Sequence, residues 1–117
     1  MSVHETLQIP AETGNSLAQR YEAVTAAAAV VAGIASIETG PDPLVEALAD
    51  SHGRMAERAQ GIVADMAAVL EPGIATLLAV SSRGADAAPA ARALWAEYEL
   101  ERIALARVLG RSAYLTA

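Results

Sequence analysis

The sequence predicts an all-α fold, an antiparallel helical bundle of three long helices plus one short helix. Apolar residues recur three and four positions apart over most of the chain, and the alternating pattern of a half-buried strand is missing. Ala, the residue with the highest helix propensity, occupies 29 of the 117 positions. Breaks that contain Gly or Pro divide this pattern into separate helices.

The chain divides into a tail and one domain. Residues 1–15 are predicted as an N-terminal tail because Pro10 and Gly14 interrupt any periodic pattern. Residues 16–117 are predicted as a single helical-bundle domain, since no linker long enough to separate two domains follows.

The first two helices have clear start and stop signals. Ser16–Gln19 has the form of a capping box, and Gly40-Pro41 ends the first helix after Thr39. Asp42 is then a good N-cap for a second helix that runs to Leu70 and stops at Glu71-Pro72-Gly73, with continuity through Ser51–Gly53 left open. The short connection between these helices predicts an antiparallel hairpin.

Two further helices complete the prediction. A short one covers about residues 74–82 and stops at Gly84. Asp86 then caps a fourth helix that ends at Gly110.

The first helix carries two apolar stripes. One is a seam at heptad-like spacing, formed by Leu17, Tyr21, Val24, Ala28, Val31 and Ala35. The second stripe, Val30, Ile34 and Ile37, lies well round the helix from the first, so we expect other helices or a second subunit to cover it. Because 34 apolar residues larger than Ala must hold three long helices, the core of one chain is thin, and we expect a homodimer or a higher homo-oligomer.

Three polar residues occupy positions where the apolar pattern predicts hydrophobic ones. They are His52 in the second helix and the adjacent Glu101 and Arg102 in the fourth. A partly buried His that hydrogen-bonds a neighbour, and a Glu and Arg at the edge of the bundle, are one interpretation. A polar cluster of all three across the helix interface is the other, with His52 as a candidate phosphoryl acceptor.

A resemblance to a known protein family supports the interpretation of His52 as a phosphoryl acceptor. Ser51-His52-Gly53-Arg54-Met55, followed by Gln60 and Ile62, is similar to the first helix of the dimerisation hairpin in one class of sensor histidine kinases. Arg102–Ala106 with Val108 is similar to the second helix of that hairpin, although Ala56-Glu57 replaces the usual Lys-Asn. The resemblance implies a phosphotransfer module in which His52 accepts the phosphoryl group.

Composition excludes several classes of site and partner. The chain has no Cys and no Lys, and its net charge is −6, so thiolate metal sites are excluded and nucleic acid is an unfavourable partner. We expect no metal site, because the positions three and four residues from His52 hold no second ligand. The N-terminus lacks a secretory signal, and the thirteen-residue apolar stretch from Thr25 to Ile37 is too short for a membrane span, so we expect a cytoplasmic protein that does not contact a membrane.

The sequence therefore predicts a non-enzymatic interaction, scaffold or regulatory protein without a cofactor, which self-associates through its Ala-rich helix and has the capacity to bind a protein partner. A stand-alone phosphotransfer module that uses His52 is the first alternative. A helical bundle that binds a small molecule or haem is the second.

Overall fold

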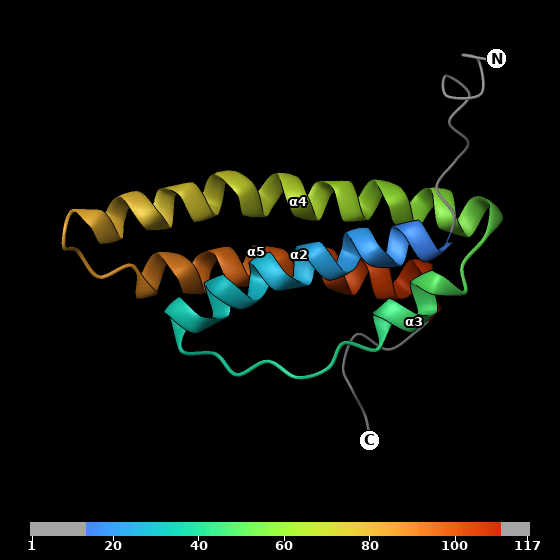
Figure 1. Ribbon diagram of the computed structural model, residues 1–117, viewed down its shortest axis with the longest axis horizontal. Coiled ribbons are helices and arrows are strands. Elements are labelled where there is room, and N and C mark those ends of the chain that lie inside the picture. The colour runs from blue at the N-terminus through green and yellow to red at the C-terminus, as the bar shows by residue number, and fades with distance from the viewer. Residues whose placement is uncertain (1–13, 111–117) are drawn as a thin grey trace, which may run out of the picture.

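The computed structural model describes residues 14–110, and this part of the chain is all-helical (Figure 1). Its four helices are α2 (Gly14–Ala35), α3 (Leu44–Ala49), α4 (Gly53–Ser82) and α5 (Ala88–Val108). Three are long and one is short, which confirms the predicted fold class at that level.

The three long helices pack against one another with α5 antiparallel to the other two. α4 and α5 form a hairpin through residues 83–87. The start of α2 lies near the end of α5, because Tyr21 and Arg102 both bind Asp42. α2 and α4 therefore run in the same direction, and the predicted antiparallel hairpin between the first two helices is wrong. The segment of residues 36–43 returns along the molecule before α3 begins (Figure 1).

The expected end of the first helix at Thr39 is also wrong, because α2 stops at Ala35. Ser36 adopts a left-handed conformation with φ 61°. The Ile37 N–H donates to the Ala32 carbonyl at 2.8 Å and the Ser36 N–H donates to the Gly33 carbonyl at 3.3 Å. These two bonds form a Schellman motif with Ser in the place that Gly usually takes. The start differs as well: α2 begins at Gly14, so the expected capping box at Ser16 lies inside the helix.

The predicted second helix is broken between Ala49 and Gly53, at the point where the sequence leaves its continuity open. Gly53 takes φ 62°, which separates the short α3 from α4. The expected stop at Glu71-Pro72-Gly73 and a separate helix over residues 74–82 are wrong, since α4 runs through Pro72. Pro72 has no backbone N–H to donate to the Ala68 carbonyl oxygen. Both residues are exposed, so water can bond to that oxygen instead.

The fourth predicted helix is close to α5. Asp86 lies two residues before its first residue, and its Oδ1 accepts a hydrogen bond from the Ala88 N–H at 3.0 Å, although the N-cap position itself is taken by Ala87. Gly73 of α4 faces this helix, where a Cβ atom would come within 2.6 Å of the Leu94 Cδ atoms. Gly73 thus allows the close approach of α4 and α5.

The core lies between the three long helices and α3. The predicted seam of α2 is buried throughout. The largest fully buried side chains are Tyr21, Leu17, Leu44, Leu48, Met66, Leu70, Leu77, Leu105, Val31 and Val63. Tyr21 is the one aromatic residue of this set, and its hydroxyl brings a polar group into the core that needs a hydrogen-bond partner.

Candidate functional site

A polar cluster centred on Asp42 joins three parts of the fold. Asp42 lies at the end of the returning segment, and its Oδ1 accepts a hydrogen bond from the Leu44 N–H at 2.9 Å, at the start of α3. Its Oδ2 accepts from the Tyr21 hydroxyl at 2.5 Å and from Arg102 Nε at 3.1 Å. Arg102 Nη1 also lies 3.5 Å from Glu99 Oε1. One carboxylate therefore holds α2, α3 and α5 together.

Burial controls the acid–base properties of this cluster. Burial raises the pKa of Tyr21 well above its ordinary value, and Tyr98, the hydrogen bond to Asp42 and the charge of Asp42 raise it further. Burial also raises the pKa of Tyr98 to about 12. Burial by itself lowers the pKa of Arg102, but Asp42 and Glu99 outweigh it and leave the pKa above the ordinary value. The tyrosines are therefore neutral and Arg102 is charged at neutral pH.

The structure does not gather the three polar residues that the sequence singled out. His52 is exposed at the start of α4, with its Nδ1 3.4 Å from the Asp50 carbonyl oxygen, so the expected buried seam histidine is wrong. The break before Gly53 takes His52 out of the helical seam. Glu101 is half-buried and forms no ion pair within residues 14–110. Arg102 is mostly buried, and its partners are Asp42 and Glu99 rather than His52.

Sequence reasoning treated Asp42 only as a helix cap and Tyr21 only as a seam residue. The signal that could have joined them is the Tyr21 hydroxyl. A Tyr at a seam position brings a polar atom into the core, and that atom needs a hydrogen-bond partner.

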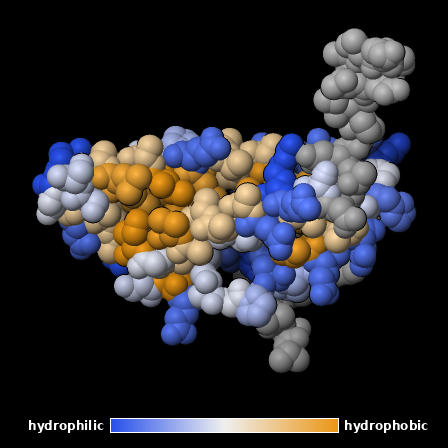
Figure 2. Space-filling model, viewed as in Figure 1, coloured by the Kyte–Doolittle hydropathy of each residue, from blue (hydrophilic) through white to orange (hydrophobic). Residues whose placement is uncertain are grey.

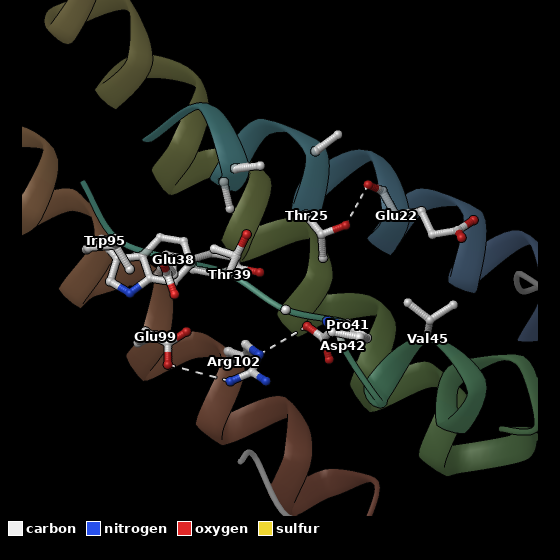
Figure 3. Close-up of a pocket in the computed structure, with 16 residues that line it drawn as sticks. Glu22, Thr25, Glu38, Thr39, Pro41, Asp42, Val45, Trp95, Glu99 and Arg102 are labelled. Carbon is white, nitrogen blue, oxygen red and sulfur yellow. Dashed lines mark hydrogen bonds and ion pairs between the residues drawn. The ribbon is translucent and has the colours of Figure 1, made fainter. Parts of the chain in front are cut away.

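A groove lies beside this cluster, between α2, the returning segment and α5 (Figure 3). We call it the α2–α5 groove; its volume is about 840 Å³. The lining residues are Glu22, Thr25, Ala26, Ala28, Ala29, Ile37, Glu38, Thr39, Gly40, Pro41, Asp42, Val45, Trp95, Tyr98, Glu99 and Arg102. The Asp42–Arg102 pair thus forms part of the wall of a space large enough for a small molecule.

A second candidate site is an apolar surface over the C-terminal half of α2 and the adjoining part of α4 (Figure 2). Val30 of α2 is 50% exposed and Leu78 of α4 is 59% exposed. Ile34 and Ile37 are partly buried and pack against the core of the same chain. The second stripe of the first helix is therefore partly covered from within, and Val30 is its most exposed member.

Comparison with protein-family models, with curated proteins and with solved structures found no match to this chain.

Proposed function

We propose that this chain is a non-enzymatic helical protein that associates with a second copy of itself and serves as an interaction or scaffold component. The observation that carries the proposal is the amount of apolar surface on α4. This helix is long and apolar enough to cross a membrane by length and composition, with an 18-residue stretch of mean hydropathy 1.7. Only 22% of that stretch is buried inside the chain. A core helix of a soluble protein with the same length and hydropathy is mostly buried.

Burial against a second copy would remove this surface from water. Val30 and Leu78 are each at least half exposed, so covering either side chain contributes about 1 kcal/mol. Large apolar patches on a protein surface usually mark sites of interaction. The Ala-rich composition of α2 adds to the argument, since small side chains let two helices approach closely.

Charge distribution supports the same surface. Residues 23–37 and residues 72–82 contain no charged side chain, whereas the whole chain has a net charge of −6. An interface confined to these two stretches would contain no charged side chain of its own.

Sedimentation equilibrium tests the proposal. The wild-type protein should have a mass above the 12.0 kDa of one chain. Val30→Glu and Leu78→Glu should each weaken association at least about a hundredfold, because a carboxylate in an apolar interface is desolvated without a partner. Leu100→Glu is the matched control, since Leu100 is 69% exposed on α5 but lies beside charged residues.

Two results would contradict the proposal. One is a wild-type protein that sediments as a single chain at every concentration. The other is a loss of association in Leu100→Glu equal to that in Val30→Glu. A single chain that floats with zwitterionic vesicles would assign the surface to lipid instead.

The phosphotransfer alternative rests on His52, whose side chain is exposed at the start of α4. Incubation with phosphoramidate, followed by phosphorus NMR, tests it directly. If wild-type protein gives no phosphohistidine signal, or His52→Gln keeps that signal, His52 is not the acceptor.

A further inference from the structure

The α2–α5 groove has an unusual combination of wall residues. Small side chains of α2, among them Ala26 and Ala29, leave space where the returning segment passes over that helix. Trp95 and Glu99 of α5 stand on one side, and Glu22 and Thr25 of α2 stand on the other (Figure 3). The groove thus combines an apolar floor with polar and aromatic walls.

Carboxylates dominate the charge of this groove. Glu22, Glu38, Asp42 and Glu99 line it, and Arg102 is the one cationic side chain in the wall. Asp42 and Glu99 both pair with Arg102. Glu22 and Glu38 form no ion pair within the described part of the chain, so the groove is left with a negative potential.

The indole of Trp95 adds a second recognition element. Trp95 is half-buried in the groove wall, and its ring centroid lies 5.1 Å from that of Tyr98 with the two planes tilted by 45°. The face of an indole attracts a cation through its negative quadrupole, and it also packs well against apolar groups. Carboxylates beside an aromatic face favour a ligand with positive charge and apolar surface together.

A bare metal ion does not fit this arrangement. Within residues 14–110, no group of three His, Asp or Glu side chains is placed to hold a metal ion. The volume of about 840 Å³ lies instead within the range of sites for drug-sized molecules. The ligand class that matches size, charge and aromatic wall is an organic cation.

We propose that the α2–α5 groove binds a small organic cation, a protonated amine or quaternary ammonium carried on an apolar body. Its charged group would lie between Glu38 and the Trp95 face, and its apolar body would cover the alanines of α2. The groove shares Ile37 and alanines of α2 with the apolar surface that we propose for self-association, but Val30 and Leu78, which test association, do not line it, so failure of one proposal can be told from failure of the other.

Trp95 is the single tryptophan of the chain and reports on this groove by its fluorescence. The probe is benzyltrimethylammonium, with benzyl alcohol as a neutral control and benzoate as an anionic control. We expect saturable binding of the cation with a dissociation constant of about 1 mM or below. Added salt should weaken this binding. Neither control compound should give a saturable change.

Charge-neutralising variants locate the site. Glu38→Gln should weaken binding of the cation about fivefold, as expected when one attraction at a protein surface is lost, and Glu22→Gln should weaken it less, because the Glu22 carboxylate points away from Trp95 (Figure 3). Glu57→Gln is the matched control, because Glu57 is exposed on α4 and does not line the groove. Trp95→Leu, followed by calorimetry, should also weaken binding.

The proposal is wrong if the cation shows no saturable binding by fluorescence or calorimetry. It is equally wrong if benzyl alcohol binds as tightly as the cation, or if Glu38→Gln binds the cation like Glu57→Gln. Circular dichroism of each variant keeps a loss of folding from being counted as a loss of binding.

Discussion

Replacing Asp42 with Ala removes an acceptor that α2, α3 and α5 share. The Tyr21 hydroxyl is fully buried and would be left without its partner, which costs about 1–3 kcal/mol. The Leu44 N–H would lose its side-chain acceptor, a capping loss of about 1 kcal/mol. The side chain of Arg102 is 13% exposed and would still pair with Glu99. Loss of its ion pair with Asp42 therefore adds about 1 kcal/mol. Because these losses overlap, we expect the free energy of unfolding to fall by about 3 kcal/mol.

A double-mutant cycle with Tyr21→Phe separates the hydroxyl from the rest. In the wild-type background, Tyr21→Phe removes one hydrogen bond and should destabilise by about 1 kcal/mol. In the Asp42→Ala background, the same change removes a buried hydroxyl that has lost its carboxylate partner, so it should stabilise by about 1 kcal/mol. The change of sign is the signature of the Tyr21–Asp42 bond.

Urea unfolding, followed by Trp95 fluorescence, measures the stability loss in Asp42→Ala and the effect of Tyr21→Phe in each background. Protein concentration is held constant, because self-association would add to the apparent stability. A loss of about 3 kcal/mol should lower the urea midpoint by roughly 2 M at an unchanged slope. Asp86→Ala is the control, since Asp86 Oδ1 accepts from the Ala88 N–H as Asp42 Oδ1 accepts from the Leu44 N–H, but Asp86 has no tertiary partner among the described residues. If Tyr21→Phe costs the same in both backgrounds, the proposed role of Asp42 is refuted.

Three further predictions use the same measurement. Gly53→Ala should destabilise by about 1 kcal/mol because of its positive φ, whereas Gly61→Ala inside α4 should stabilise by about 0.5–1 kcal/mol; equal effects would contradict this reasoning. Pro72→Ala should stabilise by about 2 kcal/mol, since the regained helical bond outweighs the greater freedom of the unfolded chain; a loss of stability would count against it. Burial raises the pKa of Tyr98 to about 12 in the folded protein, against about 10 unfolded, so the contribution of Tyr98 to stability should be complete below pH 10 and be lost as the pH rises from 10 to 12. Absorbance at about 295 nm should show Tyr98 and Tyr21 ionising later in native than in urea-unfolded protein, and coincident curves would exclude the shift.

Some of the candidate surfaces were visible in the sequence. The second stripe of the first helix led to Val30, which the structure leaves half exposed. Arg102 was singled out because a charge sits in an apolar arc, and it is indeed mostly buried and paired. The alternative interpretation, a polar cluster of Arg102 with His52, is wrong, because the break before Gly53 takes His52 out of the helical seam.

The α2–α5 groove could not be predicted. It needs the returning segment to cross α2, and the predicted three-residue connection between helices excluded such a segment. Ser36 ends α2 in a conformation that favours Gly, so the usual stop signal was absent at that point and present four residues later at Gly40.

The sequence by itself determined the helical fold class, the buried seam of α2 and a helix that begins just after Asp86. These depend on periodicity and capping, which are properties of neighbouring residues. The tertiary structure decided the direction of α4 relative to α2, the continuation of α4 through Pro72 and the union of Tyr21, Asp42 and Arg102. Each of these depends on burial and on hydrogen bonds between residues far apart in the chain, and those energies outweigh the local preference of a single Pro or Gly.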